Sequence, residues 1–197
     1  IGLSAKLHTD FQVNSSFENL KVVAVPITGY MPCLKYGDQE FLRTAEIAAD
    51  VIRQHCLGTE DKSAIDFGCG TGLVGMRLLK KFQSMLFLDA SQKMIEQVQK
   101  KIAECHIGNA TTLCLDLEKE DSAGLHGDYI FMVQVLLHIR DFKPVLSKLY
   151  DALNSGGHLI IIDFNRKDDI VSDSVHPGFD QNQLMDEMSA MGYKKLQ

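Results

Sequence analysis

Residues 65–72 read Ile-Asp-Phe-Gly-Cys-Gly-Thr-Gly and lie between two apolar segments of different spacing. The short apolar run from Ala64 to Phe67 has the length of a buried strand. After the glycines, apolar residues recur at helical spacing, at Leu73, Met76, Leu78 and Leu79. Glycines suit the turn between these segments because the chain must bend sharply there and a ligand can touch a backbone that has no Cβ. The stretch therefore predicts a strand, a ligand-binding turn and a helix.

The same pattern recurs along the chain, so we expect an alternation of strands and helices. Strands are predicted at 64–67, 85–88, 112–115, 129–133 and 159–162, and helical spacing fills most of the intervals. Runs that are apolar at every position are typical of strands buried on both faces of a parallel sheet. Because crossovers between parallel strands are right-handed, the sequence predicts an α/β fold with a doubly wound, mainly parallel, Rossmann-like sheet and helices on both faces.

The helix ends are predicted from capping residues. Ser91 and Asp180 are placed to cap helices at their start, and glycines are placed to end them. The predicted stops are Gly58, the pair Gly156 and Gly157, and Gly192.

The regular alternation begins near Phe41, so we divide the chain into an N-terminal lid or edge segment, 1–40, and a ligand-binding domain, 41–197. In the first segment, 22–27 is an edge strand or part of a lid, and Tyr30 and Tyr36 belong to that lid or to the core.

Composition narrows the class of protein. The chain has 197 residues, 45% of them hydrophobic and 23% charged, with no apolar stretch of membrane-spanning length. The net charge of −6 argues against binding to nucleic acid through phosphate neutralisation. Five cysteines, without a CxxC pair, are interpreted as reduced and structural, in agreement with a cytoplasmic location. The histidines and cysteines lack the spacing of metal ligands, so we predict no metal.

Charge separates two interpretations of the glycine turn. Gly70, Gly72 and Gly75 also fit the GxGxxG pattern of dinucleotide sites. In such a site a diphosphate lies over the helix N-terminus, where the carboxylate of Asp66 would repel it. S-Adenosylmethionine carries a sulfonium and an ammonium in place of the diphosphate, so an acid at the end of the first strand attracts it. This reasoning favours the methyl donor.

Two further carboxylates follow predicted strands. Asp89 ends the second strand about twenty residues beyond the turn, where a carboxylate can accept hydrogen bonds from both ribose hydroxyls. The alternative is an aspartate that caps a helix or is merely solvated. Asp116 ends the third strand, where it accepts the adenine amino group or serves as a turn residue.

Three stretches resemble motifs of the class I S-adenosylmethionine-dependent methyltransferase family: Asp66 to Gly72, Leu88 to Met94, and Asp128 to His138. The resemblance covers about residues 41–197 and implies S-adenosylmethionine as cofactor. By this resemblance the turn holds the methionine portion of the donor, through Asp66, Gly68, Cys69 and Gly70. The end of the second strand holds the ribose and the adenine face, through Asp89, Ala90 and Met94. The end of the third strand holds the adenine edge, through Asp116 and Leu117, and a backbone carbonyl after the fourth strand, that of Gln134, accepts from the ammonium.

The sequence departs from this family in two respects. The family's sheet closes with a sixth and a seventh strand, whereas this sequence stops where the sixth would form. Either these last strands are missing or another segment, such as 22–27, covers the edge; an uncovered edge would favour a homodimer. No Asn-Pro-Pro-Tyr motif follows the fourth strand, so methylation of the amide or base nitrogens that this motif serves is not supported.

The sequence predicts a small-molecule acceptor and assigns no fixed catalytic residue. A sulfonium is already an activated leaving group, so in-line placement of the acceptor carries most of the chemistry. His138 and His176 are candidate bases, but the interpretation that we favour is packing or a hydrogen bond at a helix start for His138 and a plain turn for His176. Acidic residues in the late loop, at 168, 169 and 173, would repel a polyanion, and the pairs Lys80-Lys81 and Lys100-Lys101 are interpreted as solvated helix ends. The alternatives are an RNA or protein methyltransferase and a donor-binding subunit without activity.

Overall fold

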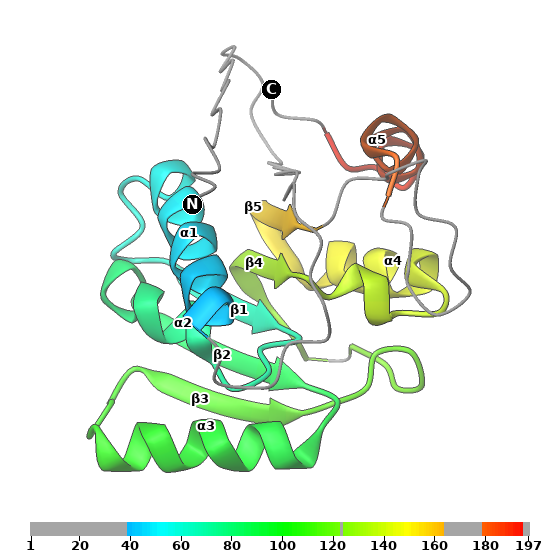
Figure 1. Cartoon of the computed structure of the whole chain (residues 1–197). Helices are drawn as coiled ribbons and strands as arrows, with labels where there is room; N and C mark the ends of the chain where they lie inside the picture. Colours follow the sequence, from blue (N-terminus) through cyan, green and yellow to red (C-terminus); the bar gives the residue numbers. More distant parts are fainter. Residues whose placement is uncertain (1–38, 123, 164–178, 195–197) are drawn as a thin grey trace, which may run out of the picture.

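A parallel β-sheet with helices on both faces forms the centre of the protein (Figure 1). The structure is a computed structural model that describes residues 39–122, 124–163 and 179–194. Its strand order is β3-β2-β1-β4-β5, and every neighbouring pair is parallel. The strands are β1 (Ser63–Phe67), β2 (Ser84–Asp89), β3 (Ala110–Cys114), β4 (Gly127–Val133) and β5 (Leu153–Ile162). The predicted doubly wound α/β fold is confirmed.

Helices fill most of the intervals between strands, as predicted, but none is described between β3 and β4. They are α1 (Gln39–His55), α2 (Leu73–Leu78), the 3-10 turn η1 (Leu79–Lys81), α3 (Gln92–Glu104), the 3-10 turn η2 (Leu136–His138), α4 (Phe142–Ala152) and α5 (Gln181–Ala190). Asp141 and Asp180 cap α4 and α5 through side-chain oxygens that accept from the N–H groups of Lys143 and Gln183. These bonds satisfy donors that a helix start leaves unpaired.

Alternate residues of β1, β2, β4 and β5 enter two separate cores. Ala64 and Phe87 face a core built with α1, α2 and α3, whereas Ile65 and Leu88 face a core built with α4 and α5. The two helix layers lie on opposite sides of the sheet (Figure 1). Because both faces are covered, the central strands are apolar at nearly every position, which is the pattern seen in the sequence.

Several predicted helix ends are wrong in detail. The first helix ends at His55, three residues before Gly58. Ser91 occupies the N-cap position of α3 but makes no side-chain capping bond. The fourth helix ends at Ala152 and passes directly into β5, so Gly156 and Gly157 lie within that strand and do not stop the helix. Pairing along β4 extends the strand backward past these glycines.

The topology brings three turns to the same end of the sheet. β1 pairs with β2 on one side and with β4 on the other, all in the same direction. The segments that follow β1, β2 and β4 therefore leave the sheet at one edge, at the point where strand order reverses. This is where ligands bind in open α/β sheets.

Some predictions fall on residues outside the described ranges. They are the lid or edge role of 1–40, for which only 39 and 40 are described, and the roles of Tyr30, Tyr36 and His176. The acidic residues at 168, 169 and 173 also lie there. None of the helices within the described ranges combines the length and apolar content of a membrane span.

Candidate functional site

The glycine turn after β1 is held against the end of β2 by backbone hydrogen bonds. The N–H groups of Gly68 and Cys69 both donate to the carbonyl oxygen of Leu88, at 2.8 and 3.0 Å. Gly68, Gly70 and Gly72 have φ of 67°, 52° and 76°, in the left-handed region that favours glycine. The sequence therefore places glycines where this turn requires them.

Two of these glycines are needed for different reasons. A Cβ on Gly68 would lie 2.6 Å from Cγ2 of Val135, so the turn after β1 is in close contact with the segment that follows β4. A Cβ on Gly70 would meet no described heavy atom within 4 Å. The turn is thus closed at Gly68 and open at Gly70. The open side leaves room for a ligand to approach the backbone.

Asp66 lies beneath the turn and is almost completely buried. Its side chain is 3% exposed, and Oδ2 accepts a hydrogen bond of 3.0 Å from the N–H of Gly75. Burial raises the pKa of Asp66 to about 7; the Gly75 hydrogen bond opposes this rise and the nearby Asp89 carboxylate adds to it. Burial disfavours the charged form of a carboxyl, and a cation placed next to the carboxyl stabilises that charged form.

Asp89 closes the turn from the end of β2. One carboxylate oxygen accepts from the N–H of Gly70 and the other from the N–H of Ser91, each at 2.8 Å. Each oxygen retains a second lone pair for a ligand hydroxyl. Asp89 is half-buried and the following Ala90 is exposed, so this strand end borders solvent. Met94, one turn into α3, is half-buried.

The residues after β3 form a tight turn. The carboxylate of Asp116 accepts from Lys119 Nζ at 2.6 Å and from the N–H of Glu118 at 3.0 Å. The Lys119 hydrogen bond is the main reason that the pKa of Asp116 is lowered. Leu117 as a whole is 2% exposed and belongs to the core shared with α4. Its carbonyl oxygen accepts from Lys148 Nζ at 2.9 Å, so Leu117 offers almost no surface to a ligand.

Gln134 adopts a backbone conformation that sequence reasoning missed. Its φ is 57°, which is uncommon for a residue other than glycine. Its N–H donates to the carbonyl oxygen of Ile162 at 2.7 Å and so ties the end of β4 to the end of β5. Non-glycine residues in this region are strained by about 1–3 kcal/mol and cluster at functional sites. The sequence carried no signal for this strain.

His138 and the cysteines have more limited roles than the site residues above. His138 is exposed in η2, where its backbone N–H donates to the carbonyl oxygen of Val135.

Cys69 and Cys56 are buried, but Cys105 and Cys114 are exposed, so the prediction that the cysteines are structural is wrong for these two. Burial, followed by the charges of Asp66 and Asp89, raises the pKa of the Cys69 thiol, which therefore stays protonated. No three potential metal ligands come together within the described ranges, and the absence of a metal stays a prediction.

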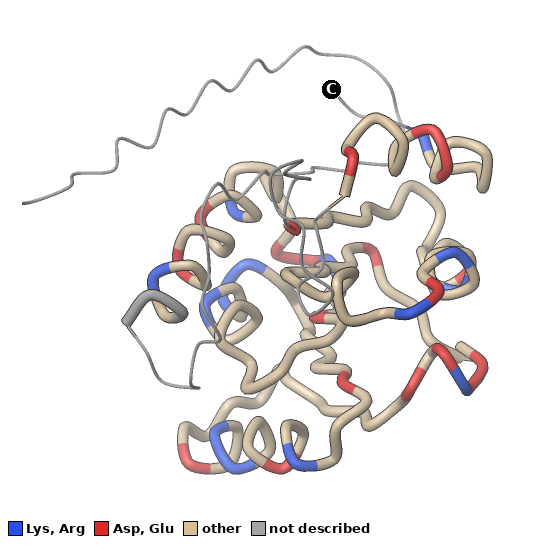
Figure 2. Tube along the Cα trace, turned by 45° about the vertical axis from the view of Figure 1, so that its right-hand side comes forward, with Lys and Arg blue, Asp and Glu red and all other residues tan. Residues whose placement is uncertain are grey.

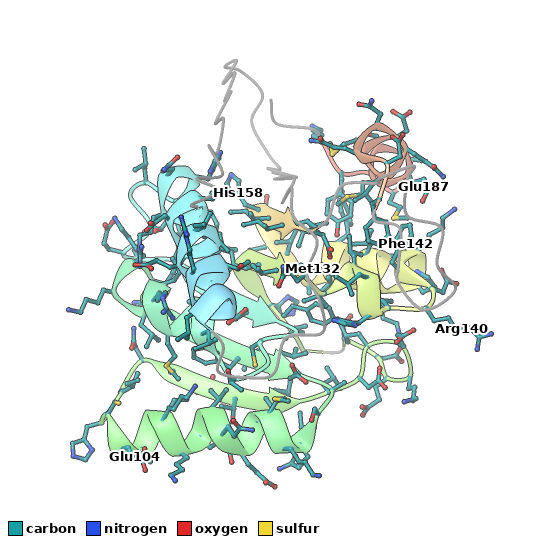
Figure 3. The ribbon with its side chains drawn as sticks, in the orientation of Figure 1. Glu104, Met132, Arg140, Phe142, His158 and Glu187 are labelled. Carbon is teal, nitrogen blue, oxygen red and sulfur yellow. The ribbon has the colours of Figure 1, made fainter. Side chains whose placement is uncertain are left out.

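Contacts join part of the predicted site, the glycine turn and the end of β2, into one arrangement. The turn 68–72 meets Asp89, the sulfur of Cys114 lies 3.7 Å from the carbonyl oxygen of Ala90, and the N–H of Arg140 donates to Glu118 Oε1 at 3.1 Å. Figure 3 shows Arg140 pointing away from the sheet. The arrangement places one desolvated carboxyl under an open glycine turn and a second carboxylate at its rim. It can receive a ligand with positive charge near Asp66 and hydroxyl groups near Asp89.

A known protein family matches the centre of the chain. The sequence model of that family, described as a methyltransferase domain, matches residues 65–159. These residues extend from β1 into β5 and include the glycine turn, Asp89, Asp116 and Gln134.

Individual relatives match the same region. An uncharacterized methyltransferase of Schizosaccharomyces pombe is 28% identical over 123 residues, which are 58% of this chain and 43% of that protein. A ubiquinone biosynthesis O-methyltransferase of Parvibaculum lavamentivorans is 30% identical over 107 residues, 54% of this chain and 42% of that protein. A solved structure of coclaurine N-methyltransferase bound to N-methylheliamine and S-adenosylhomocysteine shares the fold at a TM-score of 0.54 and 16% identity, over 59% of this chain and 35% of that one. The chain thus spans less than half the length of these relatives.

Proposed function

Because this chain belongs to the class I S-adenosylmethionine-dependent methyltransferase family, we propose that it passes the methyl group of S-adenosylmethionine to a small-molecule acceptor by in-line displacement. S-Adenosylmethionine is the cofactor of this family. When bound, it supplies a methyl group already activated on a sulfonium. The task of the protein residues is to bind, orient and exclude water.

The observation that carries this proposal is the desolvated carboxyl of Asp66 under the open turn. A diphosphate above that turn would add negative charge beside two carboxylates, Asp66 and Asp89. A cationic nucleoside compensates both of them. The space beside Gly70 and the two free lone pairs on Asp89 fit such a molecule.

We assign the donor-binding residues as follows. The turn residues Asp66, Gly68, Cys69 and Gly70 would hold the methionine portion, and Asp89 and Ala90 would hold the ribose and one face of the adenine. Met94 and Asp116 would contact the adenine, and the carbonyl of Gln134 would accept from the ammonium. Leu117, which the sequence also places at the adenine edge, is buried and is assigned no contact. The first group is supported by the contacts that join the turn to Asp89. Asp116 would accept the adenine amino group while it keeps its bonds to Lys119 and Glu118.

Two observations support a small-molecule acceptor. The net charge is −6, and Figure 2 shows acidic and basic segments interspersed along the described trace, which favours a small acceptor over RNA. The relatives point the same way, because one is named for ubiquinone biosynthesis and another was solved with N-methylheliamine. Where the acceptor keeps its proton at neutral pH, the exposed His138 is a candidate base.

The proposal is tested by transfer of a radiolabelled methyl group from S-adenosylmethionine. The purified chain is incubated with a panel of small phenols, amines and carboxylates and, in parallel, with RNA and protein extracts. Label in small molecules supports the proposal. Label only in RNA or protein, or donor binding without transfer to any of these classes, contradicts it. Asp89→Ala should abolish transfer, whereas Asp61→Ala, at an exposed carboxylate in the turn before β1, should leave it unchanged.

Further features of the whole protein follow as proposals. Within the described residues β5 pairs only with β4, so its outer edge could pair with a second copy of the chain, which sedimentation would detect. Residues 1–40 would act as a lid or edge segment of the 41–197 domain. The buried thiols of Cys56 and Cys69 suit a reducing cytoplasm.

A further inference from the structure

We propose that Lys101 is a positioning residue for the donor site: its ammonium group fixes the shape of the glycine turn that receives S-adenosylmethionine. The inference rests on the proposed function. It concerns a residue far along the chain from the turn, on the last turn of α3, and one that does not itself touch the donor.

The contact that carries the inference joins Lys101 to the backbone of the turn. Lys101 Nζ donates a partly buried hydrogen bond of 2.6 Å to the carbonyl oxygen of Thr71. The other end of the same peptide unit is the N–H of Gly72, which donates to the carbonyl oxygen of Cys69 at 2.8 Å. Both polar groups of this peptide are therefore fixed, and the peptide plane cannot rotate without breaking one of the two bonds.

The turn needs such support because its glycines allow many backbone conformations. Gly70 and Gly72 flank Thr71, and each has a positive φ. Glycine loses more conformational freedom on ordering than any other residue, so a flexible turn would have to be ordered when the donor binds. The end of β2 already fixes the first half of the turn, through Leu88 and Asp89. Lys101 fixes the second half, so that β2 and α3 together hold the turn in place before the donor arrives.

The neighbouring Lys100 shows what an ordinary surface lysine of this helix does. Its side chain is 74% exposed and lies 3.8 Å from Glu104, which Figure 3 labels at the end of α3. The prediction that both lysines are solvated is therefore wrong for Lys101 and agrees with the structure for Lys100. A hydrogen bond from a charged donor to a carbonyl is stronger than one between neutral groups. Lys100 supplies a matched control, since it has the same charge and lies on the same helix.

The test compares Lys101→Met, Lys101→Arg and Lys100→Met in the full chain. Calorimetry measures the Kd for S-adenosylhomocysteine, thermal unfolding measures Tm, and NMR measures amide exchange at Gly70 and Gly72 without ligand. Lys101→Met should weaken binding about tenfold, in line with the loss of one hydrogen bond from a charged group. It should also speed exchange at Gly72. Lys101→Arg should restore both properties, and Lys100→Met should behave as the wild type.

The outcomes separate this inference from the proposed function. Wild-type protein that binds S-adenosylhomocysteine, together with Lys101→Met that binds equally well, would overturn the inference alone. A lowered Tm with unchanged affinity and unchanged exchange at Gly72 would also overturn it, because Lys101 would then be merely structural. Wild-type protein that takes up no S-adenosylhomocysteine would overturn the proposed function and this inference with it. Should Lys101→Met fail to fold, Lys101→Gln, which keeps a neutral donor, is measured in its place with the same expected direction.

Discussion

Replacing Asp66 by asparagine is expected to change how the stability of the protein depends on pH. Burial raises the pKa of Asp66 from 3.8 to about 7, so between these values the native state binds a proton that the unfolded state has released. Stability therefore falls as pH rises through this window, by up to 1.36 kcal/mol per pH unit. Between pH 5 and pH 8 the contribution of this one carboxyl amounts to roughly 2–3 kcal/mol. The amide introduced by Asp66→Asn cannot ionise, and its oxygen can still accept from the N–H of Gly75.

The assay is urea unfolding of the wild type and Asp66→Asn at pH 5, 6, 7 and 8. Subtracting the two curves removes the titration of histidines, which both proteins share. The variant should gain stability over the wild type as pH rises, and most of this gain should appear below pH 7.5. Parallel curves for the two proteins would refute the claim that Asp66 is a desolvated acid.

A second carboxyl on the same sheet should behave in the opposite way. Burial of Asp128 opposes its ionisation, but hydrogen bonds from Ser63 and Asn154 lower its pKa below the ordinary value. Its contribution to stability is therefore present at neutral pH and is lost as pH falls through the lowered pKa. Asp128→Asn should lower the free energy of unfolding at pH 7, and this loss should shrink toward pH 3. A variant that is more stable than the wild type at pH 7 would contradict the assignment of these hydrogen bonds.

Two further substitutions test packing around the site and the C-terminal helix. Gly68→Ala should lower the free energy of unfolding by about 2–4 kcal/mol, because a positive φ and contact with Val135 both oppose a Cβ. Gly108→Ala, which meets no described atom within 4 Å, should change the urea midpoint little; equal effects of the two would argue against this reasoning. Tyr193→Phe should lower the free energy of unfolding by about 1–2 kcal/mol, as measured by thermal unfolding. The reason is that the Tyr193 hydroxyl donates a buried hydrogen bond of 2.7 Å to the carbonyl oxygen of Leu146. An unchanged Tm would show that this bond contributes nothing.

Much of the fold is predictable from local patterns in the sequence. The central strands β1, β2 and β4 are apolar at most positions because both faces of the sheet are covered, and short apolar runs also located β3 and the second half of β5. Asp180 was recognised as a cap because its side chain serves the first turn of its own helix. Predictions failed where a neighbour in space decides the outcome. The exit from α4 is one example, because strand pairing with β4 extends β5 back through Gly156 and Gly157.

In the candidate site, too, features that depend on local sequence are predictable and features that depend on distant contacts are not. Glycines at 68, 70 and 72 were recognisable because a positive φ is a local requirement. The positive φ of Gln134 was not, because it depends on the bond to Ile162 in a different strand. The sequence predicts a solvated Lys101 because it does not reveal that the last turn of α3 lies against Thr71. Contacts between distant segments have no signature in a single sequence.

The central claim is that the turn above Asp66 is built for a cationic nucleoside and not for a diphosphate. Isothermal titration calorimetry of the full chain with S-adenosylhomocysteine and, separately, with nicotinamide and flavin dinucleotides measures this preference directly. We predict saturable uptake of S-adenosylhomocysteine that Asp89→Ala abolishes, and no measurable heat with either dinucleotide. Tight binding of a dinucleotide with none of S-adenosylhomocysteine would contradict the account.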